Sequence, residues 1–238
     1  MKFSFFRKPI TNVKPYRDIT LLDLYKVIKG NYYQAVTENL RTLSEKDYKA
    51  QKSKALDYIT PGGTFATREV KSLIAPSGFV SIDIDNITNP EEVKAQLTTY
   101  ENVQLIFTSP SGKGVKAIFK DSGTCDSYLE EFENIAAKLK SYEIKVDKGT
   151  SDISRACFLC YDSLVWINPQ YLNVPAPANY YEILKDGRTI LMSPKGYPAS
   201  WDIHKSVVND FDRVQVQTRP QKRIKHYQKI GLTNSGAV

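Results

Sequence analysis

The chain has few cysteines and no long apolar run. Three of its 238 residues are cysteines, an odd number that cannot pair fully within the chain, so the composition favours a reducing compartment. No apolar stretch approaches the roughly 20 residues of a membrane-spanning helix. The first residues form only a short apolar patch before Arg7 and Lys8, unlike a secretory signal peptide. We therefore expect a cytoplasmic protein with no membrane partner.

Apolar and aromatic residues are plentiful enough for a packed core. Hydrophobic residues make up 41% of the chain, which includes 15 Tyr and 10 Phe. A helical part over about 19–55 precedes a mixture of strands and helices over about 60–185, and this order indicates the α+β class. We expect one domain over 1–190 and a basic, irregular tail over 191–238.

Local signals predict individual helices and strands. Thr20 is expected to cap a helix that ends at Gly30, and Asn89-Pro90 to begin another helix. The strands on either side of a polar turn at 109–113 are expected to form a hairpin. The other expectations are helices over 32–53, with a break at 44–45, and over 126–141; strands over 144–147, 155–162 and 180–184; and an irregular segment over 1–18, interrupted by Pro9 and Pro15.

The segment 79–85 reads as a strand that carries two acids. Its β-branched residues alternate with polar ones, so Asp83 and Asp85 point to the same side, about 7 Å apart along the strand. Such a pair of carboxylates can chelate one divalent cation or bridge two, as enzymes acting on phosphate esters require. An edge strand with a solvated outer face shows the same pattern, so both readings stay open for this motif alone.

The polar turn between the two hairpin strands has groups that suit a phosphate. Glycine lets the backbone approach a ligand, and the N–H groups of a turn can hold an anion. The spacing is not that of a P-loop, and a strand rather than a helix is expected to follow. An ordinary hairpin loop is the alternative. The side chains and glycine concerned are Ser109, Ser111, Gly112, Lys113 and Lys116.

A third polar stretch places acids after one expected strand and Arg155 at the start of the next. Either Asp147 or Asp152 can be a third metal-binding carboxylate. We favour Asp147, because the end of a strand holds a ligand more firmly than the middle of a loop. Arg155 can hold that carboxylate or contact a triphosphate. A structural pairing of a loop acid with Arg155 is the alternative.

Together the three stretches resemble the archaeo-eukaryotic primase (primase-polymerase) superfamily. The order is hydrophobic-D-hydrophobic-D at 82–85, S-P-S-G-K-G at 109–114, and an acid followed eight residues later by Arg155. The nearer resemblance is to the N-terminal domain of the mobile-element and phage primases found beside virulence-associated-E-type helicases. The residues that carry it are D-I-S-R-A-C-F-L-C-Y-D at 152–162.

The resemblance implies a fold, an activity and a set of site residues. The fold implied is an RRM-like antiparallel sheet with flanking helices beside an N-terminal α/β unit. The activity implied is that of a metal-dependent DNA primase or polymerase, a nucleotidyltransferase that replicates a mobile element or phage. Its implied partners are nucleoside triphosphates, a single-stranded DNA template and a separate replicative helicase. The implied ligands of a two-metal Mg²⁺ or Mn²⁺ site are Asp83, Asp85 and Asp147, and the implied nucleotide-binding residues are Ser109, Ser111, Gly112, Lys113, Lys116 and Arg155.

The chain departs from the superfamily at Lys116, where the second motif usually has a histidine. Lysine can neutralise phosphate charge, but it cannot take the same hydrogen-bonding or proton-transfer role at neutral pH. This departure favours a second hypothesis, a catalytically inactive nucleic-acid-binding or replication-accessory protein of the same fold. The third hypothesis is a plain structural or protein-binding domain, which would require that the three polar stretches occur together by coincidence.

Much of the net charge of +7 lies in the tail, where residues 205–229 contain seven Lys or Arg and two Asp. Such a run attracts polyanions, so we expect it to hold the backbone of the template and to make binding salt-dependent. The residues concerned are Arg219, Lys222, Arg223 and Lys225. Cys157 and Cys160 have the spacing of zinc ligands but lack a second pair, so we interpret them as core residues.

Overall fold

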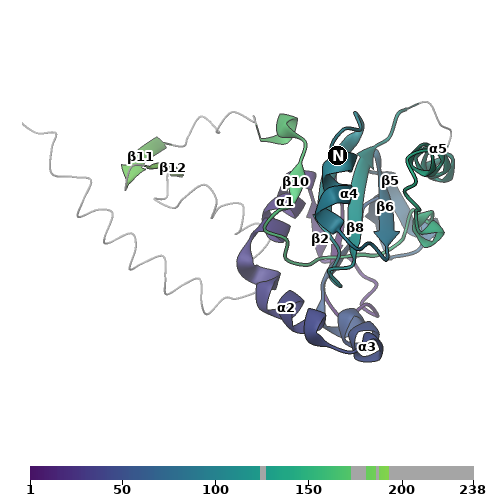
Figure 1. Cartoon of the computed structure of the whole chain (residues 1–238), viewed down its shortest axis with the longest axis horizontal. Coiled ribbons are helices and arrows are strands. Elements are labelled where there is room, and N and C mark those ends of the chain that lie inside the picture. Colours follow the sequence, from purple (N-terminus) through teal and green to yellow (C-terminus); the bar gives the residue numbers. More distant parts are fainter. Residues whose placement is uncertain (124–126, 173–180, 186–187, 193–238) are drawn as a thin grey trace, which may run out of the picture. The chain divides into compact units, whose positions relative to one another are not determined.

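The structure, a computed structural model, describes residues 1–123, 127–172, 181–185 and 188–192 (Figure 1). The chain divides into two compact units, Met1–Leu172 and Asn173–Val238. In the second unit, the described residues form an antiparallel hairpin of β11 (Tyr181–Lys185) and β12 (Arg188–Met192). The domain end predicted near residue 190 falls within this second unit, and all the features described next belong to the first.

Three helices follow the first strands; the first is capped by Thr20 as predicted, the third begins at a capping serine, and the second has no capping side chain. In α1 (Leu21–Lys29) the Thr20 hydroxyl accepts a hydrogen bond from Asp23 N at 3.2 Å, and the Asp23 carboxylate accepts one from Thr20 N at 2.9 Å. The predicted helical region over 32–53 is divided between α2 (Gln34–Thr42) and α3 (Glu45–Ala55), preceded by the short 3₁₀ helix η1 (Asn31–Tyr33). Ser44 caps α3, so the predicted break is confirmed.

The first sheet joins segments that are distant in the sequence. Its strand order is β2-β1-β3-β9, and each neighbouring pair is antiparallel. The prediction that residues 1–18 are irregular is wrong, because the first six residues already contribute a strand with both faces buried. Burial of both faces removes the apolar–polar alternation that would have indicated a strand. The strands are β1 (Phe3–Phe6), β2 (Arg17–Ile19), β3 (Tyr58–Thr60) and β9 (Cys157–Phe158).

The second sheet carries the candidate site. Its strand order is β10-β7-β8-β6, and β7 and β8 form the predicted hairpin. Alternate residues of β6, such as Ile82, pack against α4 (Pro90–Leu97) and α5 (Tyr128–Lys140) on one face. On the other face, Phe79 meets Phe3 of the first sheet edge to face at 6.3 Å. The strands are β6 (Phe79–Asp85), β7 (Val103–Thr108), β8 (Gly114–Lys120) and β10 (Trp166–Ile167).

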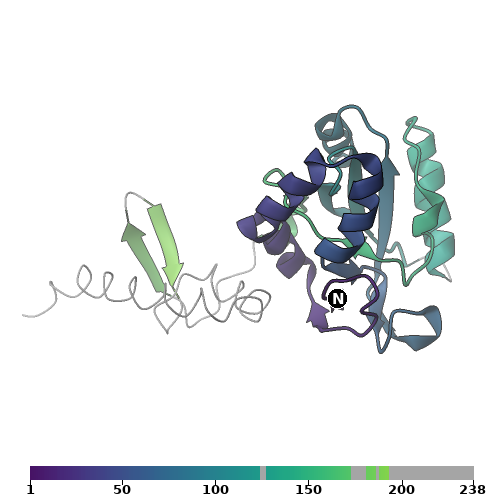
Figure 2. The same cartoon turned by 90° about the horizontal axis from the view of Figure 1, so that it is seen from below.

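The two groups of helices lie on different flanks of this unit. Figure 2 shows α5 along one flank and the purple and blue helices of residues 21–55 along the other, with strands between them. A small antiparallel pair of β4 (Gly63–Phe65) and β5 (Leu73–Pro76) completes the described strands of this unit. The remaining 3₁₀ helices are η2 (Val70–Ser72), η3 (Lys148–Thr150) and η4 (Pro169–Tyr171).

Two strands predicted late in the unit are wrong in whole or in part. Residues 144–147 form no strand: a single backbone bond joins Asp147 N to the β6 carbonyl of Asp83 at 2.8 Å, and η3 follows at once. Within 155–162 only β9 is a strand. Leu159 N still donates to Asp57 O, which extends the β3–β9 register by one pair. Beyond it, Tyr161 N donates to the Thr37 hydroxyl of α2 and Asp162 N to Ile28 O of α1, so the ladder ends.

The predicted α+β class is confirmed, with five α-helices and antiparallel strand pairs in the described part of the chain. In that part, no helix combines the length and apolar character needed to cross a membrane. The fold places the polar end of β6 beside the β7–β8 turn, and this neighbourhood is the candidate site.

Candidate functional site

The two acids of β6 lie on the face that turns away from α4 and α5. Ile82 and Ile84 are buried in the helix-covered core, whereas the Asp83 side chain is 17% exposed and Asp85 is exposed. The alternation that predicted a shared side for both acids is therefore confirmed. The start of β8 packs closely here, since a Cβ on Gly114 would lie 3.1 Å from both Asp85 Oδ1 and Ser109 Oγ. Because Gly114 has no side chain, the end of the turn can pack directly against Asp85.

Lys116 forms an ion pair with Asp83. The two residues are directly opposite in the β6–β8 register, and Lys116 Nζ donates to Asp83 Oδ2. The Lys116 side chain is only 10% exposed. Burial is the largest single influence and lowers the pKa of this ammonium, but the surrounding groups, chiefly Asp83 and with it Asp85, together hold the pKa above the ordinary value of 10.5. Lys116 is therefore a fixed positive charge at neutral pH.

The Asp83 carboxylate keeps an unused oxygen. Among the described residues, Lys116 is its only hydrogen-bond or ion-pair partner, and that contact is made through Oδ2. Beside the pair lies the Cys157 thiol, whose pKa burial raises to about 12. Cys157 is thus a neutral neighbour, and both Cys157 and Cys160 are buried in the core as predicted.

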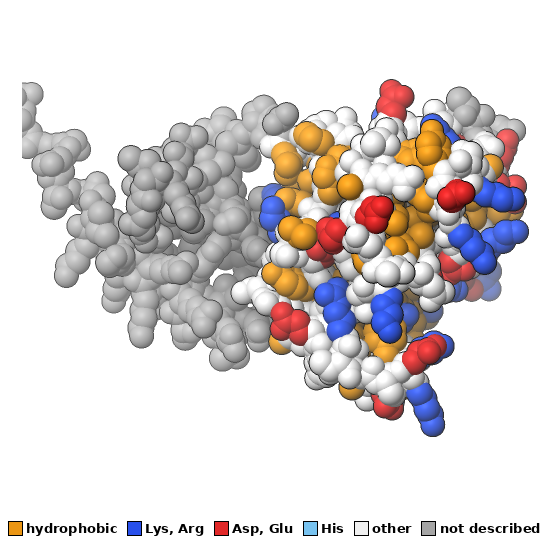
Figure 3. Space-filling view, viewed as in Figure 1, with side chains coloured by type: hydrophobic (Ala, Val, Ile, Leu, Met, Phe, Trp, Pro, Cys, Tyr) orange, Lys and Arg blue, Asp and Glu red, His pale blue; other side chains and the backbone are white. Residues whose placement is uncertain are grey.

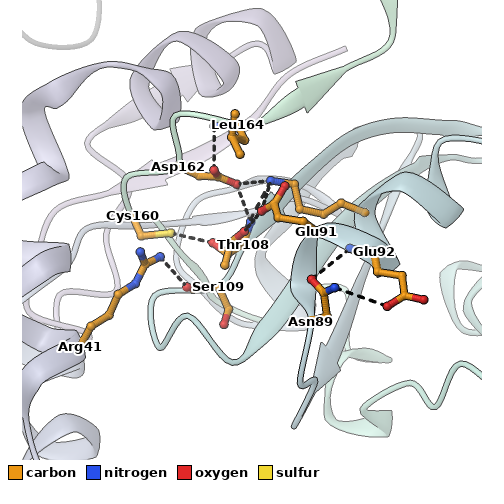
Figure 4. Close-up of polar contacts among 10 residues, drawn as sticks. Arg41, Asn89, Glu91, Glu92, Thr108, Ser109, Cys160, Asp162 and Leu164 are labelled. Atoms are coloured by element: carbon orange, nitrogen blue, oxygen red, sulfur yellow. Dashed lines mark hydrogen bonds and ion pairs between the residues drawn. The ribbon is translucent and has the colours of Figure 1, made fainter.

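The β7–β8 turn is supported by a hydrogen bond from another element, α2. Gly112 adopts φ 73°, a left-handed conformation that favours glycine. The Ser109 and Ser111 hydroxyls lie 3.0 Å apart, and Lys113 is exposed at the tip. Arg41 of α2 donates to the carbonyl of Ser109 at 3.3 Å (Figure 4). The predicted phosphate-binding groups therefore sit on a supported turn.

A buried network anchors the strand that leads into this turn. Asp162 Oδ2 accepts hydrogen bonds from Lys94 Nζ at 2.9 Å and from Thr108 N at 2.7 Å, while Oδ1 accepts one from Leu164 N at 2.9 Å. Lys94 also bonds Glu91 Oε1 at 3.0 Å. Figure 4 shows the Asp162 carboxylate with bonds toward Leu164 on one side and toward Thr108, the last residue of β7, on the other. Sequence reasoning missed Lys94, which looked like an ordinary helix lysine.

The third polar stretch lies beside β6. Asp147 is tied to the strand by its backbone bond to Asp83, but its carboxylate accepts a bond from Gly149 N at 2.9 Å. Asp152 is used locally, since its Oδ1 accepts bonds from the backbone and hydroxyl of Ser154. Arg155 is exposed. A Cβ built on Gly149 would lie within 3.5 Å of both Arg155 Nη2 and the Asp147 carboxylate, so these two side chains lie on either side of the same glycine.

The three acids are not gathered into a ready-made metal site. Across the described residues, no three side chains of His, Cys, Asp or Glu lie close enough together to hold a metal ion. Asp147 is nevertheless bonded to β6 while Asp152 is turned to Ser154. The role of Asp147 as a third ligand stays a prediction.

Helix α3 contributes two further residues that sequence reasoning missed. Burial raises the pKa of Tyr48 to about 12, against the opposing effect of its hydrogen bond with Ser111. The Lys52 ammonium lies over the Tyr48 ring at 5.4 Å and the Phe158 ring at 5.2 Å. Burial and the nearby charge of Lys116 lower its pKa. The i,i+4 spacing of Tyr48 and Lys52 was the one available signal.

Lys52 is a cation without an anionic partner. Within the described part of the chain no carboxylate lies within ion-pair distance of it, although Asp83, Asp85 and Arg155 all act on its charge. It therefore belongs to the same neighbourhood as the acids and is available to a ligand. The four basic residues predicted to bind nucleic acid, Arg219, Lys222, Arg223 and Lys225, lie outside the described residues.

Comparison with known proteins gives one match. Residues 51–166 match the family model described as BT4734-like, N-terminal domain. No curated protein and no solved structure matches the chain. The matched stretch contains Lys52, the acids of β6, the β7–β8 turn and Arg155. The chain is thus similar to the BT4734-like N-terminal domain over the part that carries the candidate site.

Proposed function

We propose that this protein is a metal-dependent nucleotidyltransferase of the primase-polymerase type. The observation that carries the proposal is the meeting of two β6 acids, a serine-rich turn and unpaired cations from separate elements. Acids and cations around one point suit a reaction in which a 3′-hydroxyl attacks a nucleoside triphosphate. The RRM-like character of the second sheet is part of the same proposal.

The carboxylates of β6 fit a divalent cation. Asp83 has an unused oxygen and Asp85 is exposed, so both offer hard oxygen donors beside solvent. Mg²⁺ is commonly held by one or two carboxylates together with substrate phosphates. Asp83 and Asp85 would hold such an ion, and Mn²⁺ suits the same donors. Bound there, the ion would neutralise charge that develops on the reacting phosphate.

The chain's own cations would bind and orient the triphosphate. Lys113 and Arg155 are exposed, and Lys52 is half-buried with no anion beside it. Cations near acids give a site that attracts phosphate groups while keeping the metal ligands charged. Ser111 would add a hydroxyl donor from the turn, where it lies 3.0 Å from the Ser109 hydroxyl.

The template would be held outside this neighbourhood. On the face shown in Figure 3, Lys and Arg side chains alternate with Asp and Glu side chains around apolar ones. A mixed surface of this kind does not by itself track a polyphosphate backbone. The positive charge of residues 205–229 is the ground on which we assign single-stranded DNA to the basic tail, with a separate helicase as a further partner in replicating a mobile element or phage.

A second candidate is an inactive accessory protein that binds nucleic acid. The observation that favours it is the ion pair of Lys116 with Asp83, because a lysine replaces the usual histidine and occupies one oxygen of the first acid. This candidate would bind single-stranded DNA without incorporating nucleotides.

Primer synthesis and extension test both candidates. Full-length protein is incubated with single-stranded DNA, labelled nucleotides and Mg²⁺ or Mn²⁺, with and without a primer. We expect template-dependent product that falls at least about 100-fold in Asp83→Asn. Glu133→Gln, an exposed substitution on α5, is the matched control. Incorporation by Asp83→Asn at the control rate would sink the assignment of the acids, and DNA binding without any incorporation would support the accessory protein.

A further inference from the structure

The Lys116 ammonium lies against the first acid of β6. Lys116 lies directly across from Asp83 in the β6–β8 register, and its ammonium bonds the carboxylate from within the sheet. The side chain is 10% exposed and is enclosed by neighbours such as Cys157 and Asp83. A cation buried in this way cannot swing into solvent to admit a second cation without leaving Asp83 unpaired.

The remaining donors are too few for two ions beside that ammonium. Asp83 has one oxygen left, Asp85 has its carboxylate, and Asp147, with one oxygen bonded to Gly149 N, forms no three-ligand cluster with them. No other group within the described ranges completes a cluster of three ligands. Two divalent ions and an ammonium would put five positive charges against the two acids of β6, whereas one ion and the ammonium put three.

We infer that Lys116 replaces one of the two divalent cations of a two-metal site, so that this site takes a single Mg²⁺ or Mn²⁺ held by Asp83 and Asp85. The inference rests on the proposed function and specifies its metal requirement. The ammonium supplies positive charge next to Asp83. Unlike a metal ion, however, it has no coordination sites, so it cannot coordinate a hydroxyl oxygen. Its role is to neutralise Asp83 and to position that carboxylate.

Counting bound Mn²⁺ tests the inference without an activity measurement. Purified full-length protein is titrated with Mn²⁺, and free ion is followed by electron paramagnetic resonance. We expect one ion per wild-type chain and two per chain in Lys116→Met, because the substitution frees the second oxygen of Asp83. Lys120→Met, an exposed change at the end of the same strand, is the matched control and is expected to bind one.

Asp85→Asn provides a variant that does not disturb a buried group. Asp85 is exposed, so the fold should be kept even where Lys116→Met fails to fold. In a single-ion site this change is expected to weaken Mn²⁺ binding at least about tenfold and to leave no second site. A residual tight ion in Asp85→Asn would overturn the inference.

The outcomes separate this inference from the proposed function. Two ions on the wild-type chain, together with primer extension, would leave the function standing and overturn the single-ion site. One ion on both the wild type and a folded Lys116→Met would also overturn it, because the lysine would then not be occupying a metal position. Absence of Mn²⁺ binding together with absence of incorporation would overturn both.

Discussion

Two buried lysine–aspartate pairs lie on opposite faces of the β7–β8 hairpin, and they differ in how fully their polar groups are used. Asp162 has both oxygens bonded, and Lys94 is bonded to Asp162 and Glu91. Within the described ranges, Asp83 has a single partner, Lys116, on one of its two oxygens. Side-chain exposures are 5% and 7% in the first pair but 10% and 17% in the second.

The comparison distinguishes a structural ion pair from one that belongs to a site. A buried pair contributes to a fold when every donor and acceptor has a partner, because an unmet group keeps its full desolvation cost. The Lys94 pair meets this condition and anchors the end of β7. In the Lys116 pair, Asp83 Oδ1 has no partner among the described residues, and the side chain is partly accessible and lies two residues from the exposed Asp85. Unused bonding capacity next to solvent marks the place for a ligand.

The largest predicted effect is loss of stability in Lys94→Met. The change leaves Asp162 as an unpaired buried carboxylate, so the free energy of unfolding should fall by about 3–5 kcal/mol. Urea denaturation followed by circular dichroism measures it. Lys94→Met/Asp162→Asn should lose less than the single change, because the uncompensated charge is gone. A fall below about 1 kcal/mol in the single variant would show that this pair is not structural.

Lys116→Met should destabilise the fold less. Asp83 is closer to solvent and has fewer bonds to lose, so we expect the free energy of unfolding to fall by about 1–3 kcal/mol. The same denaturation experiment on both lysine variants makes the comparison direct. A loss equal to that of Lys94→Met would mean that the two pairs have the same structural role.

The pH dependence of the Lys116 pair follows from its raised pKa. A lysine whose pKa is higher in the folded state stabilises the fold fully below its ordinary pKa of 10.5 and loses this contribution only as pH rises through the folded value. The stability difference between wild type and Lys116→Met should therefore be the same at pH 7 and pH 9. A difference that shrinks across this interval, in denaturation at both pH values, contradicts the raised pKa.

Lys52→Met should affect binding much more than stability, because the fold loses only the cation–π contacts of Lys52 with Tyr48 and Phe158. Lys52 has no ion-pair partner among the described residues, so its loss removes no such bond from the fold. We expect the KM for nucleotide to rise about tenfold, equivalent to one charged hydrogen bond of about 1.5 kcal/mol. Steady-state kinetics measure it, with the exposed Lys54→Met on the same helix as control. An equal rise in KM for Lys54→Met would show that the effect comes from the change in net charge alone.

The smallest effect concerns the cysteine beside each pair. Burial raises the pKa of Cys157 to about 12 and that of Cys160 further. Both thiols should therefore resist iodoacetamide at pH 8 in the folded protein. Cys157, next to the more exposed pair, should react faster than Cys160, which donates to the carbonyl of Thr108. Mass spectrometry in a Cys125→Ser background compares the two, and the reverse order would contradict the difference in accessibility.

Prediction from sequence worked best where the signal was local. Thr20, Ser44 and Asn89 cap helices because their side chains bond backbone groups three residues on, so the pattern and the structure share one cause. The β7–β8 hairpin and the shared side of Asp83 and Asp85 follow from turn residues and strand alternation in the same way.

Prediction failed where partners are distant in the chain. Phe3–Phe6 is a strand because β2 and β3 pair with it, and the latter is more than fifty residues away. Residues 155–162 were read as one strand because they are apolar, but their backbone groups bond three different elements. No local pattern contains that information.

The sequence alone determined the α+β class, the helix starts, the hairpin and the candidate acids, because short-range bonding and the alternation of side chains decide these features. Tertiary structure decided which polar groups are used up and which are left for a ligand. It placed Lys116 on Asp83, brought Lys52 of α3 beside them and closed the Lys94–Asp162 network. These are contacts between segments far apart in the chain, and only the packed fold sets their burial and their partners.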